Sequence, residues 1–181
     1  VLDCGCGTGS NLEMLKPFGD AVGFDLTWTG VEFAHQHGHR VLQASIADIP
    51  FRDATFDIVT SFDVFQCLPD PVEQRAMADI VRVLKPGGHV LLHVAALEML
   101  HGRHSVLSEE VRRYTPARLR AVVEGAGLEV VRLTFDQASL LPIMLPVRLW
   151  QRRTAQGGAV EAGEFEITVP PAPINAALSA L

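Results

Sequence analysis

The residues whose types and spacing could hold a small polar ligand come at the start of the chain: Asp3, Gly5, Gly7 and Gly9. They follow an apolar stretch that predicts the end of a buried strand, so the acid is expected at the carboxyl edge of that strand. Alternating glycines permit a tight turn because they lack a Cβ. The capping box Ser10-x-x-Glu13 predicts that a helix begins directly after the turn. Together these features predict a cradle whose backbone N–H groups point at a ligand.

The spacing of the glycines separates two kinds of nucleotide ligand. Dinucleotide-binding turns use G-x-G-x-x-G, whereas Ser10 stands here where that pattern requires its third glycine. An acid beside the turn would repel a pyrophosphate, but S-adenosylmethionine carries no phosphate. The D-x-G-x-G-x-G sequence resembles the first motif of the class I S-adenosylmethionine-dependent methyltransferases. This resemblance implies that Asp3 holds the amino group of the methionine moiety and that the glycine backbone packs against it.

Two more acids follow predicted strands. Asp25 ends residues 21–25 at about the position where doubly wound folds place an acid that binds both ribose hydroxyls. The resemblance gives Asp25 that role and places Leu26 against the adenine. Residues 44–51 resemble the adenine-binding segment A-D-[IVLA]-x-x-[LP]-[PF] of the same family. Asp48 is therefore expected to accept from the adenine amino group while Ile49 covers the ring.

Residues 56–70 are similar to the family segment F-D-x-V-x-S…V-L-x-H-[LV]-x-[DN], which touches cofactor and substrate just after the fourth strand. Phe62 could lie near the sulfonium, where an aromatic face attracts a cation by roughly 0.5–2 kcal/mol. A plain core aromatic is the alternative for Phe62. Cys67 replaces the histidine that relatives often carry, so no role of that histidine transfers to this chain.

No residue identifies itself as a catalytic base. Residues 96–114 have no steady period, and a long loop at the carboxyl edge of a sheet is usually functional. The stretch 112–115 resembles an R-R-Y-[ST] segment in a subgroup of these enzymes. Glu110 stands where that subgroup often has a histidine. We expect substrate or catalytic contacts at His104, Glu110 and Tyr114, and a solvated connector is the alternative.

Strand and helix signals alternate over the first 95 residues, with predicted strands at 21–25, 40–43, 56–61 and 89–95 after the one that ends at Asp3. Right-handed crossovers then place helices on both faces of a parallel sheet. The expected fold class is α/β, a three-layer doubly wound, mostly parallel sheet of the Rossmann-like methyltransferase type. A further helix from Thr115 and a sixth strand at 128–135 are also predicted.

Composition limits the remaining classes. The chain has 181 residues, 48% of them hydrophobic, which suits one globular domain. A net charge of −6 argues against a general nucleic-acid surface, and the [DNS]-P-P-[YF] segment of amino-methylating DNA enzymes is absent. Three cysteines form no even disulfide set, which indicates a reducing, cytoplasmic setting. No cysteine or histidine spacing matches a metal site, so no metal is expected.

Residues 1–135 are predicted to form the S-adenosylmethionine-binding domain. Residues 136–181 are predicted to add an apolar helical segment, a linker and the start of a helix to the same domain. The stretch 139–153 is too short and interrupted to span a bilayer, but it could contact a membrane surface or pack inside the protein. The chain lacks an initiator Met and begins within a predicted strand, so we expect truncation at both ends.

The predicted function is methyl transfer from S-adenosylmethionine to a small-molecule acceptor. Because the 139–153 segment is apolar and could cover the substrate, apolar or lipid-like acceptors are included in this prediction. Two alternatives stay open: a nicotinamide-dependent oxidoreductase, and a cofactor-binding module without turnover. A small molecule is the expected partner, without nucleic acid. The sequence leaves the acceptor, the methylated atom and the oligomeric state open.

Overall fold

The computed structural model describes residues 1–100, 108–136, 138–142 and 145–146. It contains a five-stranded sheet in the order β3-β2-β1-β4-β5. The strands are β1 (Leu2–Cys4), β2 (Val22–Asp25), β3 (Val41–Gln43), β4 (Phe56–Phe62) and β5 (Leu84–His93). All neighbouring pairs run parallel. The expected doubly wound α/β fold is therefore confirmed.

The first strand is the centre of the sheet. Leu2 is in register with Val22 on one side and with Val59 on the other. All three residues of β1 are buried, as a strand with neighbours on both edges and layers on both faces should be. The residues that follow β1, β2, β3 and β4 therefore emerge at one edge of the sheet, where open α/β sheets bind their ligands.

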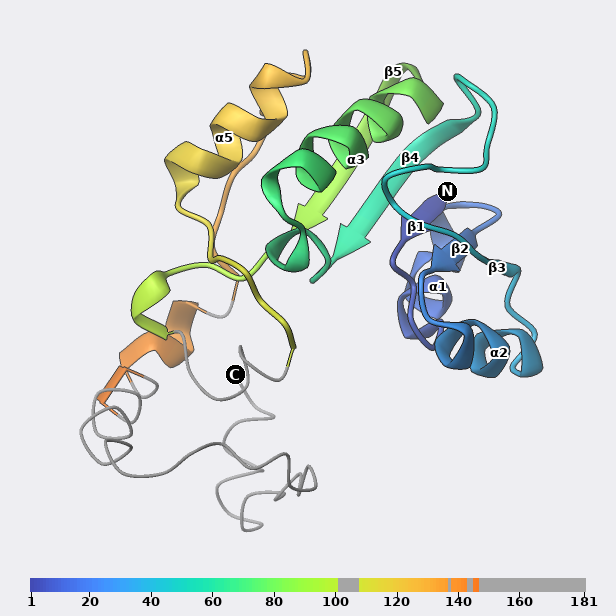
Figure 1. Cartoon of the computed structure of the whole chain (residues 1–181), viewed down its shortest axis with the longest axis horizontal. Helices are drawn as coiled ribbons and strands as arrows, with labels where there is room; N and C mark the ends of the chain where they lie inside the picture. Colours follow the sequence, from blue (N-terminus) through green and yellow to red (C-terminus); the bar gives the residue numbers. More distant parts are fainter. Residues whose placement is uncertain (101–107, 137, 143–144, 147–181) are drawn as a thin grey trace, which may run out of the picture.

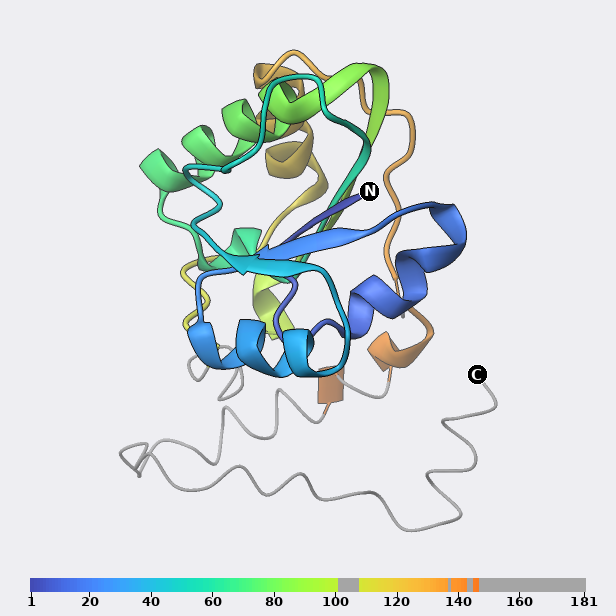
Figure 2. The same ribbon diagram turned by 90° about the vertical axis from the view of Figure 1, so that its right-hand side faces the viewer.

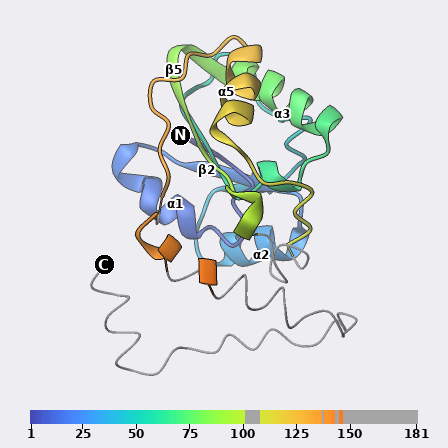
Figure 3. The same cartoon turned by 90° about the vertical axis from the view of Figure 1, so that its left-hand side faces the viewer.

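The helices form the outer layers. They are α1 (Ser10–Leu15), α2 (Trp28–Gln36), α3 (Asp70–Val83) and α5 (Pro116–Gly125). Figure 1 shows α3 lying across β4 and β5, with α5 beside it. Figures 2 and 3 show α1 and α2 on the other side of the sheet from α3 and α5. This arrangement follows from right-handed crossovers, because the chain reverses its direction across the sheet between β3 and β4.

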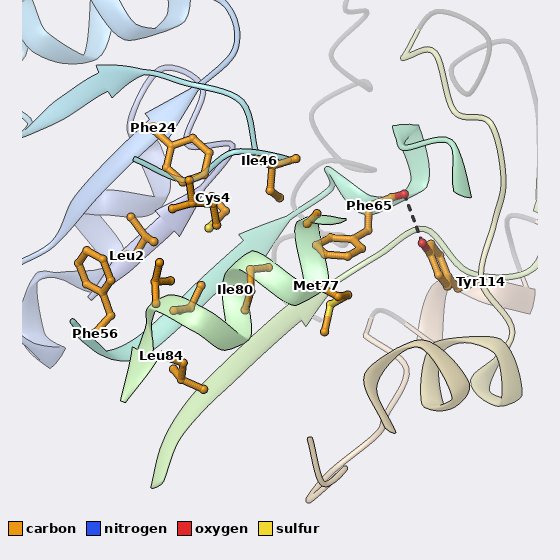
Figure 4. Packing of buried hydrophobic residues seen from close by; sticks show 14 residues of the cluster. Leu2, Cys4, Phe24, Ile46, Phe56, Phe65, Met77, Ile80, Leu84 and Tyr114 are labelled. Carbon is orange, nitrogen blue, oxygen red and sulfur yellow. Dashed lines mark hydrogen bonds between the residues drawn. The ribbon is translucent and has the colours of Figure 1, made fainter. Parts of the chain in front are cut away.

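One hydrophobic cluster joins the sheet to α3 (Figure 4). The helix contributes Ala76, Met77, Ile80 and Val83, all at most 2% exposed. Their three- and four-residue spacing makes one apolar stripe that packs on the sheet. The helix is therefore amphipathic, with its apolar face on the sheet.

Several local predictions differ from the structure. The α1 N-cap is Gly9 in the left-handed region, without a side-chain capping bond, so the Ser10–Glu13 capping box does not form. Helix α2 spans residues 28–36, and its N-cap Thr27 likewise makes no side-chain capping bond. Residues 128–135, predicted as a sixth strand, form neither a strand nor a helix. At the start of α5, Thr115 does cap the helix, accepting from the Arg118 N–H.

Within the described residues, no helix is long and apolar enough to cross a membrane. Most of the 139–153 stretch, predicted to contact a membrane surface or pack inside, lies outside those residues, as does all of 147–181. The predicted division of the chain at residue 135 stays a prediction.

Candidate active site

The glycine turn after β1 uses backbone conformations that favour glycine. Gly5, Gly7 and Gly9 have φ values of 80°, 51° and 88°. A Cβ on Gly5 would lie 2.2 Å from Val64 Cγ2, so this glycine is needed for close packing. A Cβ on Gly7 would meet no described atom within 4 Å. Gly7 therefore leaves open space at the middle of the turn.

Asp25, at the end of β2, holds this turn in place. Its Oδ2 accepts the Gly7 N–H at 2.9 Å, and its Oδ1 accepts the Thr27 N–H at 2.8 Å. The Thr27 hydroxyl donates to the same Oδ1 at 2.5 Å. The carboxylate thus joins the ends of β1 and β2 at the carboxyl edge of the sheet.

Asp3 is fully buried, with 0% of its surface exposed. The Thr60 hydroxyl of β4 donates to its Oδ1 at 2.7 Å, whereas Oδ2 has no hydrogen-bond partner among the described residues. Desolvation by burial raises the pKa of Asp3 to about 6, although the Thr60 and Asn11 side chains oppose the shift. The negative charge of Asp25, at the end of the neighbouring strand, raises this pKa further.

The loop after β3 presents the next two predicted residues differently. Asp48 is exposed, and its N–H donates to the Ser45 carbonyl at 3.1 Å. Ile49 is only 2% exposed and belongs to the hydrophobic cluster. Leu26, which follows Asp25, is 69% exposed and offers apolar surface near the end of β2.

The ends of β4 and β5 bring together residues that the sequence reasoning did not select. Asp63 has a φ of 57°, a left-handed conformation that is uncommon outside glycine. Its Oδ1 lies 3.2 Å from both Gln66 Nε2 and His93 Nδ1. Phe62, predicted to lie near the sulfonium, is half-buried and its ring centroid is 6.3 Å from that of His93. Position at the carboxyl ends of adjacent strands was the signal that could have identified Asp63 and His93.

A cavity of about 380 Å³ opens beside Asp63. Its lining residues are Asp63, Gln66, Cys67, Ala95, Ser108, Glu110 and Arg113. Glu110, one of the predicted contacts, binds the Arg113 guanidinium through Nε at 3.0 Å and Nη2 at 3.3 Å. The two charges largely compensate each other, and Asp63 adds a further acid to the wall.

Asp3 and Asp25 line neither this cavity nor a second one of about 370 Å³ that lies near Leu12 and Arg40. The described atoms close over Asp3 Oδ2, which has almost no accessible surface. A ligand that reaches this oxygen therefore requires local opening of the site.

Tyr114 is placed differently from the expectation of a substrate contact. It is 2% exposed, and its hydroxyl donates to Glu73 Oε1 and to the Phe65 carbonyl at 3.3 Å (Figure 4 shows the second bond). Arg112 and Arg118 complete the surroundings of Glu73, with Nη–Oε distances of 2.7 and 3.0 Å. This buried network joins the stretch before α5 to α3, which gives Tyr114 a structural role. His104 lies outside the described residues.

Comparison with known proteins identifies the family of this chain. Residues 2–92 match the family model described as "Methyltransferase domain". The chain is 30% identical over 128 residues to a tRNA (carboxymethyluridine(34)-5-O)-methyltransferase of Arabidopsis thaliana, covering 70% of this chain and 30% of that protein. It is 35% identical over 142 residues to a malonyl-[acyl-carrier protein] O-methyltransferase of Herminiimonas arsenicoxydans, covering 73% and 53%. The chain thus spans about half or less of these relatives.

A solved structure from Thermotoga maritima is similar as well. It is described as an S-adenosylmethionine-dependent methyltransferase and possible histamine N-methyltransferase. The two chains share 25% identity with a TM-score of 0.62, over 71% of this chain and 63% of the other. The sequence match, the order of the strands and the glycine turn between Asp3 and Asp25 all indicate the same family. The chain therefore belongs to the methyltransferase-domain family and has the fold of S-adenosylmethionine-dependent methyltransferases.

Proposed function

We propose that this chain binds S-adenosylmethionine at the carboxyl ends of β1, β2 and β3 and directs its methyl group to an acceptor beside β4 and β5. The single observation that carries the proposal is the buried Oδ2 of Asp3 next to the glycine turn, which accepts no hydrogen bond from the part of the chain that the structure describes. A buried carboxylate oxygen without a donor is costly, and an ammonium group would compensate it. The amino group of the methionine moiety has that chemistry.

Asp25 suits a second contact in the same ligand. Each carboxylate oxygen offers more than one acceptor position, so Asp25 can accept from ribose hydroxyls while it keeps Gly7 and Thr27. Its existing bonds fix the carboxylate before any ligand arrives, which lowers the ordering cost of binding. Gly5 and Gly9 shape the turn, and the open space at Gly7 allows the backbone to approach the ligand closely.

The adenine would lie between the ends of β2 and β3. There Asp48 supplies an exposed acceptor for its amino group, and Leu26 and Ile49 supply apolar surface. We assign Phe62, whose ring lies beside that of His93, to the sulfonium side of the ligand.

S-adenosylmethionine, when bound, supplies a methyl group already activated on a sulfonium. The protein then has to hold the acceptor in line and exclude water, an effect that can be worth about 7–11 kcal/mol.

The cavity beside Asp63 is the described space that could hold an acceptor. His93 lies between Asp63, at 3.2 Å from its Nδ1, and Asp136, at 3.8 Å from its Nε2. This imidazole could take a proton from an acceptor that carries one. Glu110 lines the same cavity, and His104 is a candidate for a contact from the 96–114 stretch.

A small molecule is the acceptor we propose. The net charge of −6 and the acidic wall at Asp63 support a small molecule over a polynucleotide. The relatives act on a tRNA uridine derivative and on an acyl-carrier-bound malonyl group, so RNA and protein-linked acyl groups are the competing classes. A nicotinamide-dependent oxidoreductase no longer fits, because the family match and the acid before the turn both indicate a different cofactor.

Calorimetric titration with S-adenosylmethionine and S-adenosylhomocysteine tests the cofactor proposal. We expect saturable binding in the wild type and at least tenfold weaker binding in Asp3→Asn. Equal binding by both proteins, or none by the wild type, would contradict it. Radiolabelled methyl transfer to separate pools of small amines, hydroxy compounds, carboxylates and tRNA then identifies the acceptor class. Binding without transfer to any pool would support a cofactor-binding module without turnover.

A further inference from the structure

The loop between β3 and β4 carries Asp48 and Ile49 but contains no helix or strand of its own. An isolated antiparallel bridge between Ser45 and Asp48 is its one paired element. A connection this long keeps a fixed shape only if another part of the protein holds it. The side chain that does so is Arg82, near the end of α3.

Arg82 binds the backbone of this loop with its whole guanidinium group. Nη2 donates to the Ile49 carbonyl at 2.8 Å, and Nη1 donates to the Phe51 carbonyl at 2.7 Å. The planar fork of arginine suits two carbonyls in fixed positions, which a lysine cannot reproduce. An added contact to Asp53 at 2.9 Å involves a carboxylate that is 76% exposed, so it contributes little.

Asp79 completes the arrangement from one turn earlier in α3. Its Oδ1 accepts from Arg82 Nε at 2.8 Å, and its Oδ2 accepts the Ile49 N–H at 2.6 Å. Arg82 and Asp79 therefore bind both the carbonyl and the N–H of Ile49. Hydrogen bonds from Arg82 and then the Ile49 N–H lower the pKa of Asp79, so this carboxylate is ionised at neutral pH.

Fixing the backbone of Ile49 also restricts Asp48, because a peptide bond joins these two residues. With Ile49 fixed at its backbone and 2% exposed at its side chain, the direction of the preceding residue is restricted. Asp48 itself is exposed, and its N–H donates to the Ser45 carbonyl. The position of its carboxylate thus depends on contacts made one residue later.

We propose that Asp79 and Arg82 are positioning residues that set the preference of the site for adenine over other purine rings. They do so by holding Ile49, and through it the Asp48 carboxylate, in place for the exocyclic amino group. This inference rests on the proposed function. It goes beyond that function by assigning nucleobase selectivity to two α3 residues at the far side of the loop.

The test compares S-adenosylhomocysteine with S-inosylhomocysteine, which has an oxygen in place of the adenine amino group. Calorimetry gives both dissociation constants for the wild type, Arg82→Lys and Asp79→Asn. Arg75→Lys, an exposed residue of the same helix, is the matched control. Asp48→Asn is included because it changes the recognising carboxylate while it leaves both α3 residues intact. Thermal unfolding fixes a working temperature at which each variant is folded.

We expect the wild type and Arg75→Lys to prefer the adenosyl ligand by about tenfold or more, the size of one good hydrogen bond. Arg82→Lys, Asp79→Asn and Asp48→Asn should bring the ratio close to one, mostly through weaker binding of the adenosyl ligand. A merely stabilising role would weaken both ligands equally and leave the ratio unchanged, which would overturn the inference. A wild type without any preference would overturn it too. A wild type that binds neither ligand would contradict the proposed function instead.

Discussion

The Oδ2 of Asp25 accepts the Gly7 N–H at 2.9 Å, so the acid that ends β2 also fixes the turn that follows β1. Replacing Asp25 by alanine removes the proposed acceptor for the ribose hydroxyls and the bond that holds the turn. We expect S-adenosylhomocysteine to bind at least tenfold more weakly, a loss of about 1.4 kcal/mol or more. Calorimetry measures this change. Asp20→Ala, an exposed acid before the same strand, should bind like the wild type; similar losses in both variants would argue against a site at Asp25.

Gly7 and Gly38 form a matched pair for testing the open space in the turn. Both have positive φ values, 51° and 81°, and neither has a described atom within 4 Å of a built Cβ. Alanine at either position should cost about 1–2 kcal/mol of folding stability, because an L-residue is strained there. Only Gly7→Ala should also weaken S-adenosylhomocysteine binding, by tenfold or more. Unfolding curves and calorimetry separate the two effects, and equal binding losses would contradict the assignment of Gly7.

The buried carboxyl of Asp3 predicts a pH dependence of stability. Its folded-state pKa of about 6 lies above the unfolded value of 3.8, so the folded state favours the protonated form. The ionised form is therefore disfavoured by folding, and Asp3 reduces stability progressively as the pH rises from about 4 to about 6. The stability of Asp3→Asn relative to the wild type should therefore increase between pH 4 and pH 6. Above pH 6 the variant should be more stable by about 2–3 kcal/mol. Urea unfolding at pH 4, 5, 6 and 7 measures the difference in the free energy of unfolding between the two proteins. A difference that does not vary with pH would show that folding leaves the pKa of Asp3 unchanged.

The same group should make ligand binding depend on pH. An ammonium group binds the ionised carboxylate, so the affinity for S-adenosylhomocysteine should rise with pH through about 6 and then level off. Asp3→Asn should bind weakly at every pH and lose this profile. A wild-type affinity that falls over the same range would mean that Asp3 does not contact the amino group.

Tyr114→Phe separates a structural role from a catalytic one. The substitution removes the hydroxyl that donates to buried Glu73, which costs roughly 1–3 kcal/mol of stability. The rate of methyl transfer at a temperature where the variant is folded should stay within about threefold of the wild type, since Tyr114 is 2% exposed. A rate loss of a hundredfold without a loss of stability would restore Tyr114 as a substrate contact.

Local signals in the sequence identified the positions of the strands along the chain and the acids that follow them, because each lies within a few residues of a glycine or proline signal. The α1 cap differed because Gly9 adopts the capping conformation itself and leaves Ser10 inside the helix. Residues 128–135 alternate like a strand, but a strand exists only through pairing, and the sequence does not show whether the outer edge of β5 accepts a partner.

The residues that sequence reasoning missed are those whose partners are distant along the chain. Glu73 looks like a helix N-terminal acid, yet it is 3% exposed and binds Arg112 from the stretch before α5 and Arg118 from α5 itself. Asp79 and Arg82 look like an ordinary surface pair at helical spacing, and nothing local indicates that they bind Ile49. Such contacts appear only once the fold brings the segments together.

Helix α3 is attached at both ends: Glu73 near its beginning to Tyr114, and Arg82 near its end to Ile49. A single helix of 14 residues thus connects the proposed adenine-binding loop to the stretch before α5 that borders the proposed acceptor cavity. Any tilt or rotation of this helix would displace both regions in concert. Mutations that reshape one end for a new acceptor should therefore be detectable as altered nucleoside discrimination at the other.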